Sequence, residues 1–172
     1  LVDPDEIWWS KNRKIAAVLY KDKISILNTR TNTFEEKYTA PWKKEKVKVV
    51  AVAETGELVY AINETVVVLN ADGKKLWDKS LQKNICGLDI SLDNKMLAIG
   101  NYGSTLPVFN LQNGKQIVNT AMQEAEAQTV CFMPDGKQIV YTGFYGGISM
   151  MNLADGKKEL LIANEENNVS AM

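Results

Sequence analysis

The stretch "AQTVCFMPDGKQIVYTGFYGGISMMNLADGKKELLIA" at positions 127–163 contains four short apolar runs in succession. Each run has about five to seven residues, and turns rich in glycine, aspartate and proline separate the runs. Apolar runs of this length between such turns are typical of strands joined as hairpins. The stretch therefore predicts one small antiparallel sheet of four strands.

The same pattern occurs four times along the chain. An asparagine ends the third apolar run of every copy, with intervals of 42, 40 and 42 residues between Asn28, Asn70, Asn110 and Asn152. A polar turn lies upstream of each asparagine at a similar distance, at 10–14, 54–57, 92–95 and 133–137. Because two anchors recur in step, the chain predicts four copies of one supersecondary unit.

The polarity of the runs indicates how the copies pack. The middle runs are apolar at nearly every position, as in "IAAVLY" (15–20) and "TVVVLN" (65–70), which is expected for strands covered on both faces. The last run of a copy carries charge, for example at Glu35, Lys79 and Glu159, which is typical of an outer edge. Sheets with a buried middle and a charged rim predict radial stacking, the architecture of a β-propeller. A solenoid of sheets is the competing arrangement.

The predicted fold class is therefore all-β, a β-propeller in which four four-stranded antiparallel blades are visible. The chain would form one propeller domain over 1–172, and we expect blades at 5–40, 46–82, 84–122 and 126–163, with 165–172 as the start of a further blade. The sequence opens at Leu1 rather than Met and stops within a repeat. We therefore expect a part of a larger propeller, with closure of a small ring by the last strand as the alternative.

Composition excludes several classes of function. The net charge of −1 gives no overall field to recruit nucleic acid, and no apolar run is long enough to predict membrane insertion. The chain has no histidine, so the commonest general base and metal ligand is missing. Cys86 and Cys131 lie in apolar runs and are expected to be buried small side chains. The start of the chain does not indicate the compartment, and we leave the location open with a preference for the cytoplasm.

The repeated turn carries a resemblance to a known family. In copies two to four an apolar run ends in asparagine and Gly-Lys follows, as in "LNADGKK" (69–75). This resembles WD-repeat propellers, with Asn in place of the signature aspartate, and the first copy lacks Gly-Lys. The segment "FMPDGKQIVYTG" (132–143) is similar to the hairpin between the first two strands in that family.

The second copy also resembles the quinoprotein-like propellers. Trp77 follows Gly73 by four residues, which is where those proteins place a blade-docking tryptophan. The third and fourth copies have Val118 and Leu160 at this position. Both resemblances imply a divergent propeller, and neither implies a cofactor, a metal or a catalytic residue.

In a propeller of this type, the turns between second and third strands share one face with the blade connections. Two of these turns, at 100–104 and 143–147, are rich in aromatic residues and glycine, and they place Tyr102, Phe144 and Tyr145 at one rim. Exposed aromatic side chains at a rim are common anchors for a partner. The alternative is that they cap the packing between blades.

The blade connections add charge to the same face. The connections at 41–48 and 81–84 are basic, and those at 122–128 and 163–168 are acidic. Trp42, Lys43 and Lys44 are the expected contacts on the basic side, unless Trp42 packs over a blade edge. Opposite charges on two sides of a face would orient a polar partner.

The function expected from these features is a non-catalytic protein–protein interaction scaffold. Its partner would be another protein or another domain of the same chain. One alternative is a propeller enzyme, either lactonase-like or a quinone-dependent dehydrogenase, which needs several carboxylates and a metal in the channel. Asp89 in an apolar run is the one carboxylate that fits, and a hydrogen bond to a nearby turn is its other explanation. A second alternative, an envelope assembly or ligand-sensing propeller, rests on the Trp77 motif.

Overall fold

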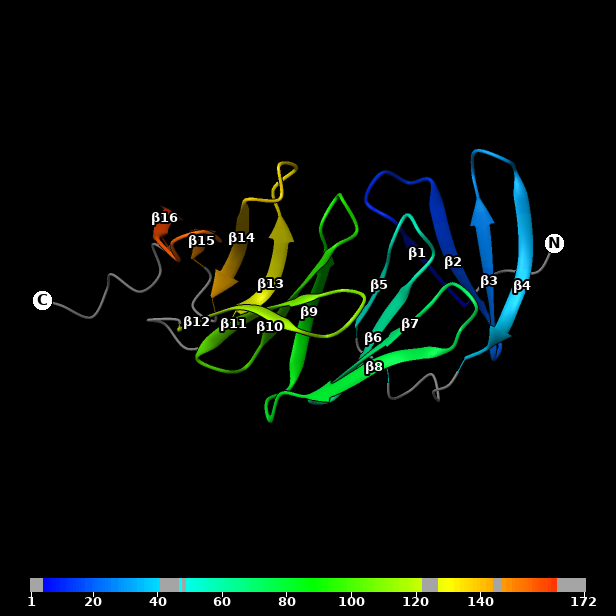
Figure 1. Cartoon of the computed structure of the whole chain (residues 1–172), viewed down its shortest axis with the longest axis horizontal. Helices are drawn as coiled ribbons and strands as arrows, with labels where there is room; N and C mark the ends of the chain where they lie inside the picture. Colours follow the sequence, from blue (N-terminus) through cyan, green and yellow to red (C-terminus); the bar gives the residue numbers. More distant parts are fainter. Residues whose placement is uncertain (1–4, 41–46, 48, 122–126, 144–146, 164–172) are drawn as a thin grey trace, which may run out of the picture.

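The computed structural model describes residues 5–40, 47, 49–121, 127–143 and 147–163 and forms four groups of four antiparallel strands (Figure 1). We call these groups the first to fourth blades. The first two blades comprise β1 (Glu6–Trp9), β2 (Ile15–Tyr20), β3 (Lys23–Asn28), β4 (Thr33–Thr39), β5 (Val49–Val52), β6 (Leu58–Ile62), β7 (Thr65–Leu69) and β8 (Lys75–Ser80). The other two comprise β9 (Ile85–Ile90), β10 (Met96–Asn101), β11 (Thr105–Asn110), β12 (Gln116–Ala121), β13 (Ala127–Phe132), β14 (Gln138–Gly143), β15 (Ile148–Asn152) and β16 (Lys158–Ile162).

Strands within a blade pair in chain order. One backbone pairing also joins strands of two different blades. Asn101 of β10 pairs with Ala127 of β13, which connects the third and fourth blades at a single position. Gly87 and Gly100 make this approach possible, because a Cβ on either would lie within 2.6 Å of a backbone oxygen of β13. The contact is therefore a local bridge and not a ladder that merges the two blades.

Burial follows the expected order of strands. The middle strands are almost wholly buried, as the patterns of β2, β6 and β10 show. The last strand of each blade is mostly exposed, including the charged β4 and β8. The apolar middle and polar rim read from the sequence are therefore present in the structure.

The hydrophobic core lies between the faces of successive blades. Ile15 and Ala17 of the first blade pack with Leu58 and Tyr60 of the second. Separate clusters fill the space between the second and third blades and between the third and fourth. Because successive blades bury the faces that they turn toward each other, the fold is all-β with the blade stacking of a β-propeller.

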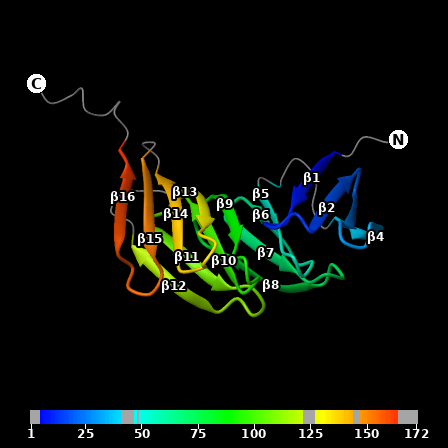
Figure 2. The same ribbon diagram turned by 90° about the horizontal axis from the view of Figure 1, so that it is seen from above.

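The first strands of the blades form the inner side of the arrangement. β1 contacts β5, β5 contacts β9, and β9 contacts β13. Figures 1 and 2 show the four blades in sequence order, with β1–β4 at one end of the molecule and β13–β16 at the other. Loops that follow the first strands therefore come close to one another near the common axis.

The repeated asparagine has the same role in every blade. Its side-chain oxygen accepts hydrogen bonds from backbone N–H groups two to four residues further on, so the turn after each third strand is closed by an Asx contact. The distances range from 2.8 Å at Asn152 to 3.1 Å at Asn70 for the second residue on. This local contact explains why asparagine recurs at intervals of about forty residues.

The glycine that follows the asparagine lets adjacent blades approach. Gly73 and Gly114 have φ of 77° and 66°, in the left-handed region that glycine adopts without strain. A Cβ on Gly73 would lie 2.4 Å from the ring of Tyr38, and one on Gly114 would lie 2.8 Å from the ring of Trp77. Each of these aromatic residues stands on the last strand of the preceding blade. In the first blade, Asn32 takes the positive φ that glycine has in the others.

Trp77 docks the second blade on the third. Its indole Nε1 donates to the backbone oxygen of Leu111 at 2.8 Å, and its ring lies 5.9 Å from that of Phe109 at a tilted angle. A second contact between these blades joins the buried Glu57 to Gln112, whose Nε2 donates to Oε1 at 2.6 Å. Trp77 therefore connects the second blade to the third.

Candidate functional site

Hydrogen bonds gather the sheet connections and the turns between second and third strands at one end of the molecule. Ala40 donates to the oxygen of Asp22, Leu81 to that of Glu64, and Tyr102 to that of Asn84, at 2.7, 2.9 and 3.0 Å respectively. We call this the connection end. Its segments belong to three successive blades.

A groove of about 340 Å³ opens at the connection end of the third blade. The connection between β8 and β9 forms one wall and the turn between β10 and β11 forms the other. The lining is mainly amide, hydroxyl and backbone groups, from Ser80, Gln82, Asn101, Ser104, Gln116 and Asn119 among others. Leu81 and Pro107 are apolar members of the lining, and the fully buried Phe109 lies beneath it.

Tyr102 stands beside this groove. It lies between Asn101 and Gly103, which both line the groove, and its side chain is 42% exposed. The backbone N–H of Tyr102 is fixed by its hydrogen bond to Asn84, so the ring extends from an anchored turn. An exposed aromatic ring on an anchored turn loses little conformational entropy on binding.

The turn that carries Tyr102 is held by its neighbours. Asn101 is buried, and its amide donates to the backbone oxygen of Thr105 at 3.3 Å. A Cβ on Gly103 would lie 2.5 Å from Asn101 Oδ1 and 3.1 Å from Lys83 Cγ. Glycine at 103 therefore allows the turn and the Lys83 side chain to lie close together.

Two lysines give the groove a positive character. Lys83 lines it directly, and the Lys79 ammonium lies 5.0 Å from the centre of the Phe109 ring. No acidic side chain is among the residues that line the groove. The site therefore combines hydrogen-bonding groups, positive charge and one exposed aromatic ring.

The remaining residues selected from the sequence lie outside the described part of the chain. These are Trp42, Lys43, Lys44, Phe144 and Tyr145. Tyr102 is thus the selected residue whose position the structure gives. The groove beside it was not selected, although the basic connection at 81–84 that forms one wall was noted for its charge.

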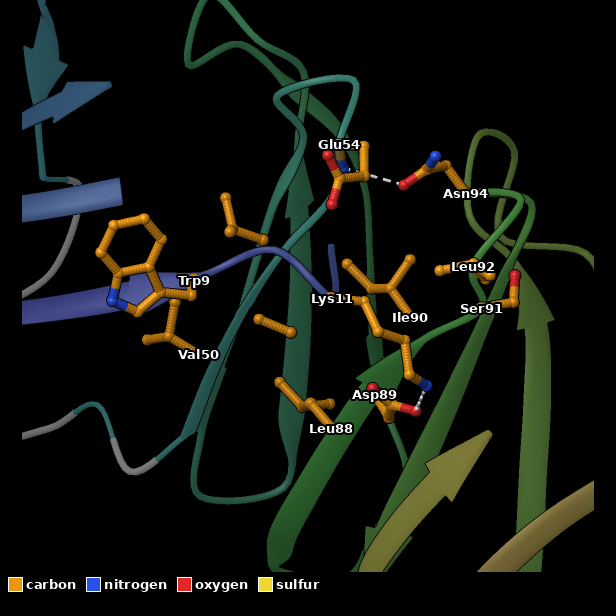
Figure 3. Close-up of a pocket in the computed structure, with 12 residues that line it drawn as sticks. Trp9, Lys11, Val50, Glu54, Leu88, Asp89, Ile90, Ser91, Leu92 and Asn94 are labelled. Atoms are coloured by element: carbon orange, nitrogen blue, oxygen red, sulfur yellow. Dashed lines mark hydrogen bonds and ion pairs between the residues drawn. The ribbon is translucent and has the colours of Figure 1, made fainter. Parts of the chain in front are cut away.

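A second hollow, of about 150 Å³, lies near the axis at the opposite end (Figure 3). Lys11, which follows β1, reaches Asp89 on β9, with 2.6 Å between Nζ and Oδ2. Lys11 Nζ also donates to the backbone oxygen of Phe132 at 2.9 Å, and the Phe132 N–H donates to Asp89 Oδ2 at 2.6 Å. Three blades meet in this contact. Asp89 thus accepts hydrogen bonds from two other blades, as in the second of the two explanations considered for it from the sequence.

Turns near this hollow are linked from blade to blade. The N–H of Asn12 donates to Glu54 Oε1 at 2.7 Å, and the N–H of Glu54 donates to Asn94 Oδ1 at 2.9 Å. Ser91 donates to Asp93 at 2.7 Å, and this hydrogen bond is the main reason that the pKa of Asp93 lies below its ordinary value. These contacts align the hairpins between the first and second strands of three blades.

The thiol of Cys131 lies near the same contact and is free. The expectation that both cysteines are buried was wrong, because Cys131 is an exposed residue and Cys86 is half-buried. Partial burial of the thiol raises the pKa of Cys131, and the nearby Asp89 carboxylate raises it further. Both influences favour the protonated thiol, which is a weak nucleophile. Among the described residues, no three aspartate, glutamate or cysteine side chains are grouped so as to hold a metal ion.

Comparison with known proteins supports the fold and leaves the family open. No family model matches the sequence, and no curated protein matches it. The structure resembles that of hydrazine synthase from Kuenenia stuttgartiensis, a propeller-containing protein, with a TM-score of 0.66 and 15% identity. The match covers 92% of this chain and 49% of that chain, so this chain spans about half of its length. In the described part, no helix has the length and apolar character needed to cross a bilayer.

Proposed function

We propose that this chain is a non-catalytic protein-interaction module, a propeller that binds a segment of another protein or of another domain. The single observation that carries the proposal is the groove between the β8–β9 connection and the β10–β11 turn, with Tyr102 exposed at its side. Binding residues are commonly presented by loops on a rigid scaffold. The stacked blades supply such a scaffold here.

The chemistry of the groove favours one kind of segment. Backbone and side-chain amides can pair with the main chain of an extended peptide, while Lys79 and Lys83 favour negative charge. Tyr102 offers a flat surface to an apolar or aromatic side chain. The favoured occupant is therefore an extended acidic segment with one apolar anchor.

We also infer that the propeller is a divergent member of the WD-repeat and quinoprotein-like superfamily. The Asn-turn-Gly-Lys pattern of the second to fourth blades supports this assignment. The docking of Trp77 against Gly114 and Leu111 supports the quinoprotein-like side of the resemblance.

The experiment is a selection of peptides from a displayed random library on the immobilised chain, followed by affinity measurement of the selected peptides. Acidic peptides should be enriched, and their affinity should fall with rising salt. Tyr102→Ala and Lys83→Ala should each weaken binding by about tenfold, as expected of contact residues, without lowering the melting temperature.

Leu76→Ala is the matched control, because Leu76 is an exposed apolar residue on β8 that does not line the groove. Its affinity should equal that of the unmodified chain. Selection of peptides without acidic residues, or equal affinity for the Tyr102→Ala variant, would overturn the proposal. A parallel loss of affinity and melting temperature would assign Tyr102 to folding instead.

A further inference from the structure

The outer strand of the third blade differs in charge from the outer strands of the other three. β12 has the sequence QIVNTA and carries no charged side chain. The other outer strands are charged, at Glu35, Glu36 and Lys37 on β4, at Lys75, Asp78 and Lys79 on β8, and at Lys158 and Glu159 on β16. Charge on an outer strand discourages pairing with another segment of chain. β12 lacks this protection, and Figure 2 shows it along the margin of the molecule.

The backbone groups of Asn119 point to the open side of β12. The N–H of Asn110 donates to the backbone oxygen of Lys115 at 2.8 Å, across the turn that joins β11 to β12. Because backbone groups alternate in direction along a strand, the N–H groups at positions 108 and 106 also face β12. Pro107 lies between them, opposite Asn119, and has no N–H to donate. The N–H and C=O of Asn119 therefore point away from β11.

Two features limit the open edge on either side of Asn119. The backbone oxygen of Ala121 accepts a hydrogen bond from the Lys158 ammonium of the fourth blade. At the other end, Ile117 is the extra residue of a bulge against β11 and is 50% exposed. No described strand pairs with this side of β12. The open edge is therefore short and centred on Asn119.

The open edge continues from the groove at the connection end. Gln116 and Asn119 of β12 both line the groove, and both are exposed. Lys83 lines the same groove, and Lys115 is exposed directly before β12. A segment that lies in the groove can therefore reach the backbone of β12, which has a lysine at each end.

We propose that the acidic segment adds to the third blade as a fifth strand, paired with β12 through the backbone of Asn119. This inference rests on the proposed function and specifies how the site holds its segment. Main-chain hydrogen bonds to an exposed strand edge give affinity for an extended peptide, and pockets for alternate side chains give specificity. Lys115 and Lys158 then lie close to acidic residues of the segment.

Peptides with methylated backbone nitrogens test the pairing on the unmodified chain. The probe is an acidic peptide selected in the library experiment, methylated at its odd-numbered nitrogens in one version and at its even-numbered nitrogens in another. In an added strand, only one of these sets of N–H groups faces β12. One version should therefore lose affinity by about tenfold or more, and the other by less than about threefold.

Two substitutions at Asn119 assign the pairing to β12. Asn119→Pro removes the N–H that faces the segment, and proline is tolerated where the N–H of an edge strand faces outward. This variant should bind the peptide about tenfold more weakly. Asn119→Ala keeps the N–H and removes only the side chain that lines the groove, so its loss should stay below about threefold. If Asn119→Pro does not fold, the methylated peptides decide the question.

Asp78→Pro is the matched control on another outer strand. Asp78 follows Trp77 on β8 as Asn119 follows Val118 on β12, and it lies opposite Val67 of β7. Asp78 does not line the groove. Because β8 takes no part in the proposed pairing, this variant should bind the peptide as the unmodified chain does.

The results separate this inference from the proposed function. A library that yields no acidic peptide would overturn both. Peptides that need Tyr102 but respond equally to the two methylation patterns, or equally to Asn119→Pro and Asn119→Ala, would keep the groove as the site and overturn the added strand. A fall in the molar mass of the peptide-free chain on Asn119→Pro, measured by light scattering, would assign the edge to a second copy and also overturn the inference.

Discussion

The ammonium of Lys11 lies 2.6 Å from Oδ2 of Asp89, and this ion pair joins the turn after the first strand of the molecule to the inner strand of the third blade. The same carboxylate oxygen accepts the N–H of Phe132 in the fourth blade. A single partly buried carboxylate thus organises contacts among three blades near the axis.

We predict that Asp89→Ala destabilises the chain by about 1.5–3 kcal/mol, because a charged acceptor is lost and two donors remain without it. A double-mutant cycle with Lys11→Ala should give a coupling energy of about 1 kcal/mol, measured by urea unfolding. The exposed pair Lys75–Asp78, which is 2.7 Å apart, is the control and should couple by less than about 0.5 kcal/mol. Equal coupling in the two pairs would show that the axial position adds nothing.

Trp77 should contribute to the docking of the second blade on the third. Trp77→Phe removes the hydrogen bond to Leu111 and should cost about 1 kcal/mol. Trp77→Ala also removes the ring that packs on Phe109 and should cost about 3 kcal/mol. Urea unfolding measures both, with the exposed neighbour Leu76→Ala expected to change stability by less than about 0.5 kcal/mol. Identical stabilities for the two Trp77 variants would contradict a packing role of the ring.

Alanine substitutions at Gly73 and Gly136 distinguish the cost of steric overlap from the cost of backbone strain. Both have positive φ, at 77° and 68°, so an alanine at either position should cost about 1–2 kcal/mol for its backbone conformation. At Gly136 the new Cβ meets only the end of Met96, at 3.7 Å, whereas at Gly73 it overlaps the Tyr38 ring. Gly73→Ala should therefore cost a further 1–3 kcal/mol or so in thermal or urea unfolding.

The second part of that experiment adds Tyr38→Ala to Gly73→Ala. Removal of the ring relieves the overlap, so the two substitutions together should cost less than the sum of their separate effects. Equal losses in the free energy of unfolding for Gly73→Ala and Gly136→Ala would contradict the close approach of Tyr38 to Gly73.

Tyr38 also gives a prediction about pH. Its hydroxyl is buried and has no hydrogen-bond partner among the described residues, and burial raises the pKa of Tyr38 above its ordinary value. Tyr38→Phe should therefore leave stability unchanged at neutral pH or increase it by up to about 1 kcal/mol. The folded state disfavours ionisation of the Tyr38 phenol. The contribution of the buried neutral phenol to stability is therefore complete below the ordinary pKa of about 10, and it decreases as the pH rises above that value.

Melting temperatures at pH 7 and at about pH 11 test this expectation, since the second value lies above the ordinary pKa. The unmodified chain should lose more stability between these values than the Tyr38→Phe variant does. Tyr102→Phe, at an exposed position, is the control and should lose as much as the unmodified chain. An equal loss in the Tyr38→Phe variant would contradict the buried position of the phenol.

Features that depend on local sequence could be predicted without the structure. The Asx turns at Asn28, Asn70, Asn110 and Asn152 involve residues within four positions, so their spacing alone indicated the repeat. The apolar middle strands followed from composition, because strands covered on both faces do not alternate. The docking position of Trp77 was implied by the resemblance to quinoprotein-like propellers, in which a tryptophan stands four residues after the glycine.

Features that depend on contacts between blades could not be predicted in the same way. Lys11 and Asp89 are 78 residues apart, and Glu57 and Gln112 are 55 apart, so no local pattern connects either pair. The role of Tyr38 was missed because it stands on a different position of its strand from Trp77. The groove beside Tyr102 requires two segments to meet, and the sequence indicated only that both lie at the same end.

The pairing of strands in chain order has a consequence for synthesis. As the polypeptide leaves the ribosome, β1–β4 can complete their hydrogen bonds before β5 exists, and the later blades can follow one at a time. At typical translation rates, an interval of about forty residues takes roughly two to eight seconds. Each newly formed sheet therefore exposes one apolar face to solvent for seconds, until the next blade covers it. A chaperone could bind the exposed face during this interval.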